Sequence, residues 1–264
     1  MLRARGKILN AIRTWFQEHG YVEVHTPLLV KSPAMEEHLH AIPVENQWLH
    51  TSPEFAMKRV LSSGLCRIYQ IAPCFRKEEV GVHHSKEFTM LEWYRVGAGT
   101  EELMDDVESL IACAAQSIGT AIPQWERIPV SSLINESLAP EDWFFEWVDQ
   151  VEPTLNKPTI VYGYPVWQSA LAKIRGGLAD RFEVYLEGLE LGNAFAEETN
   201  ATELRGRWEN NNQKRSAAGY PKHTIDNDFL NAVDKMPRCA GIAMGIDRLV
   251  MALTKTDHIK HVQV

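Results

Sequence analysis

The sequence contains few cysteines, and none of them lie close together. Cys66, Cys74, Cys113 and Cys239 are widely separated among 264 residues and form no Cys-x-x-Cys motif. Structural zinc sites and the disulfide frameworks of small secreted domains use closely spaced cysteines. Neither is indicated here, so we expect reduced, partly buried thiols.

A dense run of lysine and arginine is also missing, as is a long uninterrupted apolar segment. The chain has 27 lysines and arginines against 35 aspartates and glutamates, a formal net charge of −8. Strong nucleic-acid binding needs clustered basic side chains, so tight, sequence-independent nucleic-acid binding is not expected. With no signal peptide in Met1–Arg5 and no membrane-spanning run, the sequence predicts a cytoplasmic protein.

Apolar residues, in contrast, make up 45% of the chain and recur with helical and strand periods. This content can bury a substantial core, and we expect one mixed α and β domain over residues 1–264. Helical spacing predicts helices over residues 4–19, 54–63, 101–116, 202–217 and 226–232. Residues 118–157 have no clear period, which leaves open a small insert or a partner surface.

The first predicted strand, residues 21–28, follows Gly20, where the first helix is expected to stop. Pro27 confines this strand to a sheet edge or to its own end. A helix and an edge strand near the start suit a two-fold interface, so we expect a homodimer. Further on, Ser52 and Pro53 are expected as N-cap and first-turn residue of the 54–63 helix.

Residues 74–78 and 84–94 are expected to form two strands joined by a loop. Alternation places Arg76 and Glu78 on one face of the first strand, and it places four residues on one face of the second: Phe88, Met90, Glu92 and Tyr94. Charges among aromatics indicate a site for a ligand with a phosphate and a cationic group. A solvated strand face is the alternative.

A second hairpin is predicted over residues 181–186 and 189–193, with Glu187-Gly188 as its turn. A two-residue turn places Tyr185 opposite Glu190 and Glu183 diagonal to Glu190, about 7 Å away between backbones. Two carboxylates so placed repel unless a cation neutralises them, which indicates a Mg²⁺ site. Neutralisation by Arg181 or Arg175 is the alternative.

The last predicted strand carries small residues on one face, namely Gly241, Ala243 and Gly245. Such a face lets a flat ligand lie against the backbone. A helix follows directly, and Arg248 in its first turn adds to the helix N-terminus as an anion binder. Small residues that admit close helix packing are the alternative.

In this order the edge strand, the Arg-x-Glu hairpin and the glycine-rich strand resemble motifs one, two and three of the class II aminoacyl-tRNA synthetases. Within that superfamily the chain is most similar to lysyl-tRNA synthetases and to their tRNA-independent relatives, the elongation factor P β-lysine ligases. The similarity to these ligases rests on residues 51–54, 87–94 and 181–195. The resemblance implies an α+β fold with an antiparallel sheet flanked by helices.

The resemblance also implies an ATP site and a reaction. It places Arg76 at the α-phosphate, Glu78 and His84 near the adenine edge, Phe88 on the ring, and Arg248 on the other side reaching the γ-phosphate. Mg²⁺ is implied on Glu183 and Glu190. The amino-acid carboxylate would attack the α-phosphorus to give an adenylate and pyrophosphate. Arg76 and Arg248 would stabilise the charge that develops.

The resemblance implies six residues for the amino-acid pocket: Ser52, Glu54, Glu92, Tyr94, Asn193 and Glu197. A lysine-like ammonium needs such carboxylates once it is desolvated. Ala243 stands where lysyl-tRNA synthetases carry glycine and the β-lysine ligases carry alanine. Motif one also begins within the first 30 residues, without room for an anticodon-binding barrel. We therefore expect (R)-β-lysine as donor and a lysine of elongation factor P as acceptor.

Two other classes of function stay open. A ligase of the asparagine-synthetase type would share the core without needing Glu92 and Glu197. A synthetase-derived regulatory protein would be expected to lose a motif arginine or a metal carboxylate. The sequence also departs from the usual His-Asn-Pro-Glu-Phe, with His84-Ser85-Lys86-Glu87-Phe88, and carries Val82 and His83 where relatives often have arginine or tyrosine.

Overall fold

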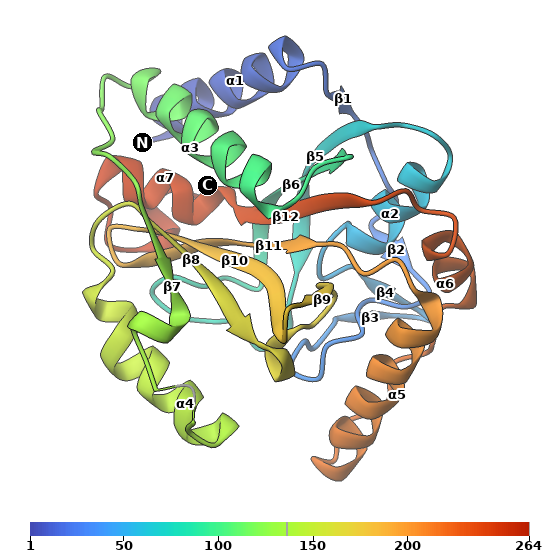
Figure 1. Ribbon diagram of the computed structural model, residues 1–264. Coiled ribbons are helices and arrows are strands. Elements are labelled where there is room, and N and C mark those ends of the chain that lie inside the picture. Colours follow the sequence, from blue (N-terminus) through green and yellow to red (C-terminus); the bar gives the residue numbers. More distant parts are fainter. Residues whose placement is uncertain (136, 264) are drawn as a thin grey trace.

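A nine-stranded sheet organises the fold (Figure 1), as seen in a computed structural model that describes residues 1–135 and 137–263. Its order is β1 (Val22–Glu23), β5 (Arg67–Phe75), β6 (Glu87–Val96), β12 (Cys239–Gly245), β11 (Leu189–Ala196), β10 (Leu178–Leu186), β8 (Thr159–Pro165) and β7 (Glu126–Pro129). A short β9 (Ile174–Arg175) pairs with β10. All neighbours are antiparallel except the outermost pairs, β1 with β5 and β7 with β8, so the expected α+β class is correct.

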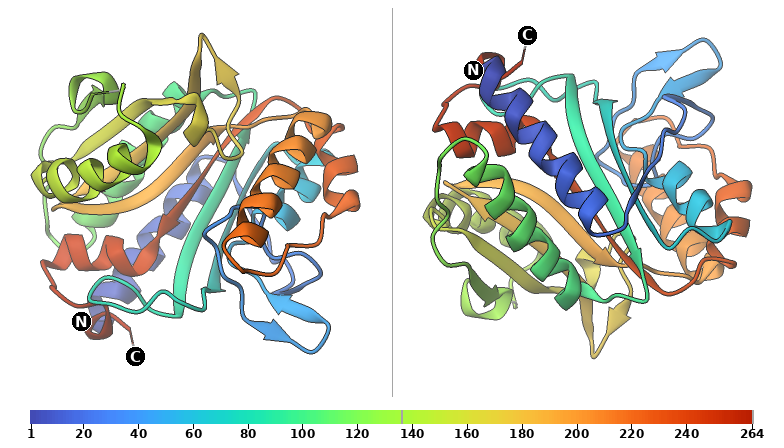
Figure 2. Two further views of the ribbon diagram at one scale, coloured as in Figure 1. Left: turned by 90° about the horizontal axis from the view of Figure 1, so that it is seen from below. Right: turned by 90° about the horizontal axis from the view of Figure 1, so that it is seen from above.

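Three helices cover one face of the sheet: α1 (Leu2–Glu18), α3 (Thr100–Gln116) and α7 (Ile246–Thr254) (Figures 1 and 2). Each carries an apolar stripe at helical spacing that is fully buried, for example Ile8, Ile12 and Phe16 on α1. Burial of each large apolar side chain stabilises the fold by about 1.5–3 kcal/mol. This layer is the main core, and it packs against one face of β6, β11 and β12.

At one end of the sheet lie α2 (Glu54–Ser62), α5 (Ala201–Ala217), α6 (Asn227–Val233) and a small sheet of β2 (Leu29–Val30), β4 (Gln47–Leu49) and β3 (Pro43–Val44). An aromatic cluster joins the three helices. The rings of Phe55 and Phe229 stack with centroids 4.1 Å apart, and Trp208 is buried beside them. The rigid cluster positions α2, whose first residue is Glu54.

The described residues of the 118–157 segment, which are all but residue 136, are a packed part of the fold. After β7 they form a 3-10 turn (Val130–Ser132), α4 (Pro140–Glu146), a π-helical turn (Trp147–Val151) and a second 3-10 turn (Glu152–Thr154). The stacked, buried rings of Trp143 and Trp147 lie 4.9 Å apart and pack near Tyr164 of β8. This segment therefore supports the outer strands, while Phe144 and Phe145 of α4 are exposed.

Two expected strands are shorter than the sequence indicated. The 21–28 strand is only Val22–Glu23, at the sheet edge as expected, because the chain then leaves β5 and Leu28 accepts a hydrogen bond from the amide of His50. The 74–78 strand ends at Phe75, because the amide of Lys77 donates to the carbonyl of His40 and turns the chain away. Arg76 and Glu78 thus lie beyond the strand.

The second hairpin has the expected turn. Glu187 and Gly188 have φ values of 53° and 73°, the left-handed pair that a tight two-residue turn requires, and Tyr185 pairs with Glu190. A bulge between Val184 and Tyr185 shifts the register, so Glu183 pairs with Asn193. The bulge moves Glu183 one residue further from Glu190 than a regular ladder would.

Helix α2 begins at Glu54 as expected, but its N-cap is Pro53 and not Ser52, although the Ser52 hydroxyl still accepts the amide of Glu54. The glycine-rich strand and the following helix lie where the sequence placed them, with Arg248 in the first turn of α7. All four cysteines are free thiols. Among the described residues no helix combines the length and apolarity needed to cross a membrane.

Candidate active site

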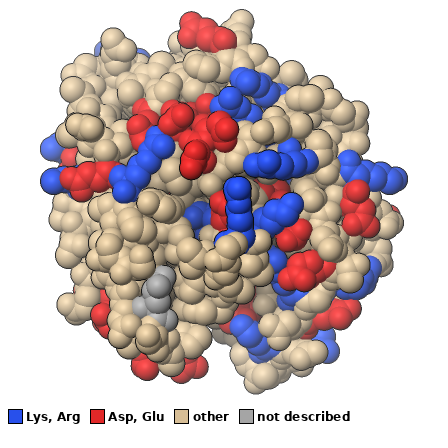
Figure 3. Space-filling model, viewed as in Figure 1, with Lys and Arg blue, Asp and Glu red and all other residues tan. Residues whose placement is uncertain are grey.

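A cavity lies where the β5–β6 connection, β11 and the start of α7 meet. Among the side chains that line it are seven of the sequence-predicted residues: Arg76, His84, Phe88, Glu190, Asn193, Ala243 and Arg248. Glu79, His83, Ser85 and Asp247 line it as well and were not anticipated. On the molecular face of Figure 3, Lys and Arg side chains gather around a central hollow with Asp and Glu side chains nearby.

Arg76 and Arg248 reach this cavity from different elements. The Arg76 guanidinium lies 5.1 Å from the Phe88 ring centroid and 2.9 Å from Glu79. Arg248 donates to the Glu190 carbonyl at 2.8 Å and contacts the His84 imidazole. Burial and the Arg248 charge lower the pKa of both His83 and His84, so these rings are neutral at pH 7. Two guanidinium groups beside an aromatic ring suit an anionic ligand that carries a flat ring.

Glu78 does not reach this cavity. Its side chain is 54% exposed and lies 3.7 Å from His40, because the chain has turned toward residues 31–40 by this point. Glu79, the next residue, takes the place beside Arg76. The predicted position of Glu78 on a strand face was wrong, because β5 ends at Phe75.

Glu183 and Glu190 have different surroundings. The Glu183 carboxylate accepts the hydroxyls of Tyr164 and Tyr185, each at 2.6 Å, and it pairs with Arg181. Glu190 lines the cavity and keeps 36% of its side chain exposed. Partial burial and the charge of Glu183 raise the pKa of Glu190. Glu190 is thus the carboxylate available to a cation, and Arg181 does neutralise Glu183.

A third carboxylate, Glu152, approaches this pair from the segment that the sequence left unassigned. Its Oε1 lies 3.4 Å from the Tyr185 hydroxyl. Burial, together with the charges of Glu190 and Glu183, raises the pKa of Glu152 to about 7. Even so, no group of three metal-binding side chains is assembled within the described residues.

Behind the cavity, two buried carboxylates and one partly buried carboxylate lie around one buried lysine. Lys58 Nζ lies 2.5 Å from Glu54 Oε1 and 2.7 Å from Glu197 Oε2. The Tyr94 hydroxyl donates to Glu92 Oε1 at 2.6 Å, while Glu92 Oε2 is buried and has no hydrogen-bond partner among the described residues. The four sequence-predicted pocket residues are therefore brought together, around a lysine that the sequence analysis did not single out.

The small residues of β12 do not form one open face. A Cβ on Gly241 would lie 2.2 Å from the Tyr94 ring and 2.8 Å from Glu197 Oε1, so the glycine is required by these side chains and no ligand can lie there. Ala243 pairs with Glu92 on one side and Asn193 on the other, and it lines the cavity with Gly245. The surface for a flat ligand is limited to that end.

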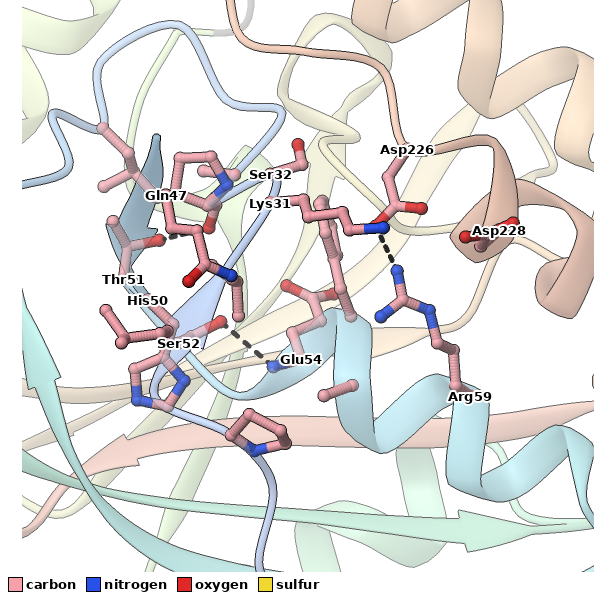
Figure 4. A pocket seen from close by; sticks show the side chains of 18 of the residues that line it. Lys31, Ser32, Gln47, His50, Thr51, Ser52, Glu54, Arg59, Asp226 and Asp228 are labelled. Carbon is pink, nitrogen blue, oxygen red and sulfur yellow. Dashed lines mark hydrogen bonds and ion pairs between the residues drawn. The ribbon is translucent and has the colours of Figure 1, made fainter. Parts of the chain in front are cut away.

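Ser52 and Glu54 border a second cavity next to α2 (Figure 4). The close-up shows Lys31, Arg59 and Asp226 on its other side, with Arg59 and Asp226 paired. Since Glu54 lines this cavity and also contacts Lys58, it links the second cavity to the buried carboxylates. Two predicted pocket residues, Asn193 and Ala243, line the first cavity, whereas Glu92, Tyr94 and Glu197 are buried and line neither.

Of the residues that the sequence analysis missed, Lys58 and Asp247 hold the site together. Lys58 stands four residues after Glu54 on a predicted helix, a spacing that brings the two side chains into contact. Asp247 accepts the amide of Thr89 at 2.7 Å and pairs with Arg5 at 2.6 Å, so it ties α7 to β6 and α1. No sequence pattern indicated Glu152, because its contact with the site depends on how the segment around it folds.

An antiparallel sheet with an arginine after one strand, an arginine in the helix that follows a glycine-rich strand, and a cavity between them defines a class II aminoacyl-tRNA synthetase domain. The chain belongs to the family described as tRNA synthetases class II (D, K and N), whose model matches residues 1–264.

Curated relatives of similar length narrow this class. The chain is 36% identical to an elongation factor P (R)-β-lysine ligase homologue of Aquifex aeolicus (strain VF5), over 94% of both chains. It is 36% identical to the elongation factor P (R)-β-lysine ligase of Proteus mirabilis (strain HI4320), over 99% of this chain and 93% of the relative. Identity to the Vibrio campbellii (strain ATCC BAA-1116) ligase is 35%, over 99% and 94%.

Proposed function

We propose that this protein is an ATP-dependent ligase that activates (R)-β-lysine as an adenylate and transfers it to a lysine side chain of elongation factor P. The observation that carries the proposal is the similarity to ligases of that name over nearly the full chain. A ligase of the asparagine-synthetase type and a regulatory protein are not favoured, since the motif arginines, Glu92 and Glu197 are all present.

The cavity between Arg76 and Arg248 is proposed as the ATP site. Phe88 offers a ring for the adenine to stack on, and Asn193 Oδ1 is buried with no partner among the described residues, so it can accept a ligand donor. His84 lies beside Arg248 and would face the nucleotide, whereas Glu78 would need to move to reach it.

Mg²⁺ fits the proposed site, because Glu190 presents a carboxylate to the cavity and hard divalent cations prefer oxygen ligands. Glu190 would hold the ion, with Glu183 positioned by two tyrosine hydroxyls behind it. Mg²⁺ supplies neutralisation of phosphate charge. Arg181 would balance the charge on Glu183. Because of this ion pair, Glu183 and Glu190 can lie close together without both binding the metal.

The reaction needs little acid or base chemistry from the chain. The carboxylate of the amino acid attacks the α-phosphorus of ATP, forming the mixed anhydride and releasing pyrophosphate. An acceptor amine then attacks the carbonyl carbon of the adenylate, loses a proton and releases AMP. Arg76 would neutralise the α-phosphate, and Arg248 would neutralise the outer phosphates. Positioning and fixed charge supply the rate enhancement.

The amino acid is proposed to lie between Ser52 and Glu54 on one side and the carboxylates of Glu92 and Glu197 on the other, with Tyr94 beside them. Asn193 and Ala243 would border its reacting end. The methyl group of Ala243 narrows that end, which favours a substrate whose amine is one carbon further along. This is the basis for (R)-β-lysine over α-lysine.

Two features of the assembly complete the proposal. Residues 1–264 would act as one catalytic domain, and pairs of chains would associate through α1 and the edge strand β1, whose outer side is unpaired in the described residues. With a net charge of −8 a tRNA is not proposed as substrate. The cytoplasm is the location this reaction requires, because it supplies ATP and the translation factor.

ATP–pyrophosphate exchange with each lysine isomer tests the donor. Exchange that depends on Mg²⁺ and is fastest with (R)-β-lysine is expected. Faster exchange with α-lysine would contradict the assignment of donor, and exchange with asparagine or aspartate alone would favour the other ligase class.

A further inference from the structure

Lys58 is a fully buried charged side chain next to the proposed amino-acid pocket. It is 1% exposed and extends from α2 between Glu54, one turn earlier on the same helix, and Glu197, on the segment that follows β11. Burying an ammonium is costly unless it is paired, and here it has two close partners. Lys58 is therefore built into the carboxylate group behind the cavity.

The charges around Lys58 do not balance. Three buried or nearly buried carboxylates, Glu54, Glu92 and Glu197, face one ammonium. Lys58 contacts one oxygen of Glu54 and one of Glu197, and the Tyr94 hydroxyl contacts one oxygen of Glu92. Glu92 Oε2 is buried and has no partner among the described residues. One oxygen of Glu92 thus lacks a positively charged donor.

We propose that Lys58 is a positioning residue for the amino-acid substrate: its ammonium fixes Glu54 and Glu197 and leaves the Glu92 carboxylate as the open partner for the side-chain ammonium of the substrate. This inference rests on the proposed function, because it assumes a substrate of the lysine class. In this role Lys58 contacts two of the binding carboxylates, Glu54 and Glu197, and it is not proposed to contact the reacting atoms.

The pKa shifts of Lys58 and of the residues around it agree with these proposed roles. Burial alone would lower the pKa of Lys58, but Glu197 and Glu54 raise it above its ordinary value, so the amine stays charged and does not act as an acceptor nucleophile. Burial and the charge of Glu54 raise the pKa of Glu92, while the charge of Lys58 lowers it. Tyr94 and Cys239, which face the same group, stay protonated because burial raises their pKa values. On the second-cavity side, burial and the Glu54 charge raise the pKa of Glu36.

Substitution Lys58→Met, which keeps the length and removes the charge, is the main test, with ATP–pyrophosphate exchange as readout. The KM for (R)-β-lysine at pH 7 is expected to rise about tenfold or more, with a smaller change in kcat and none in the KM for ATP. Burial raises the pKa of Glu197 to about 7 although Lys58 lowers it, so without Lys58 this carboxyl holds a proton at neutral pH that the substrate must displace. The increase in KM is therefore expected to shrink between pH 7 and pH 9.

Lys157→Met is the matched control, because Lys157 is an exposed lysine that also pairs with a glutamate, Glu126. Its KM values and pH profile are expected to equal those of the wild type. A Lys58→Met protein whose KM for the amino acid is unchanged, or is raised equally at every pH, would overturn the positioning role. Wild-type protein that exchanges with no lysine isomer would instead contradict the proposed function.

Lys58→Ala covers the case in which Lys58→Met does not fold. The shortened side chain leaves space for a small cation, so the variant is purified and assayed in propylammonium chloride. The KM for (R)-β-lysine is expected to fall as propylammonium rises and to be insensitive to 1-propanol. Equal KM values with propylammonium and with 1-propanol would overturn the proposal.

Discussion

At the scale of single residues, the fixed positive charges on either side of the main cavity carry the proposed chemistry. Arg76 stands beyond the end of β5 and Arg248 in the first turn of α7, yet both line one cavity. Guanidinium groups held in place need no reorganisation when phosphate charge develops, so they act mainly on the transition state.

Removal of either arginine tests this directly. Arg76→Ala and Arg248→Ala are each expected to reduce kcat/KM for ATP–pyrophosphate exchange by about 10²-fold or more, the usual loss for one preorganised donor. Arg205→Ala is the control, because Arg205 is a half-buried residue of α5 that bonds only Asn227 among the described residues. Exchange at wild-type rates in either active-site variant would contradict the assigned site.

Glu152 gives a prediction of stability against pH. Its pKa is raised to about 7, first by burial and then by Glu190 and Glu183, so the folded state binds this proton more tightly than the unfolded chain. The wild type therefore loses stability as pH rises from about 4.5 to about 7. Glu152→Gln should leave the unfolding free energy unchanged near pH 4 and raise it at pH 8 by roughly 1 kcal/mol, after allowing for solvent screening.

Urea unfolding of both proteins at several pH values measures this difference. Parallel curves for wild type and variant from pH 4 to pH 8 would show that Glu152 ionises normally. A variant that is less stable at pH 8 would show that the carboxylate is held by a favourable charge.

At the scale of elements, local patterns located the helices and hairpins well and failed where the chain changes partner. The apolar stripes of α1 and α3 and the turn at Glu187–Gly188 depend only on nearby residues, so the sequence was sufficient for them. The ends of β1 and β5 depend on hydrogen bonds to residues 40 and 50, which no local period encodes.

The packing of α4 could not be predicted from local patterns either, and it supplies a test. Trp143 is buried in an aromatic stack, whereas Phe144, the next residue, is 58% exposed. Trp143→Ala is expected to lower the unfolding free energy by about 3–5 kcal/mol, and Phe144→Ala by less than about 0.5 kcal/mol. Chemical denaturation checks both. Equal effects would mean that α4 does not pack on the sheet through Trp143.

At the scale of the whole molecule, the site is an assembly of side chains from elements far apart in sequence. The sequence identified Glu54, Glu92 and Glu197 as one pocket only through a family resemblance, since they lie on α2, on β6 and after β11. Lys58 between them, Glu152 beside Glu190, and the displacement of Glu78 all depend on how those elements are packed.

The proposed dimer is also a property of the whole molecule. Burial of α1 and β1 against a second copy would make the assembly depend on protein concentration. Sedimentation velocity at micromolar concentration is expected to give twice the 30.0 kDa mass of the chain. A species of monomer mass at every concentration would rule out the proposed pairing.

The most direct measurement of the proposed activity is the intact mass of elongation factor P after incubation with the protein, ATP, Mg²⁺ and (R)-β-lysine. One added β-lysyl group per factor is predicted, lost when ATP is omitted and when a target-lysine variant of the factor is used, and formed more slowly with α-lysine. An unchanged mass, or equal modification with α-lysine, would contradict the proposed function.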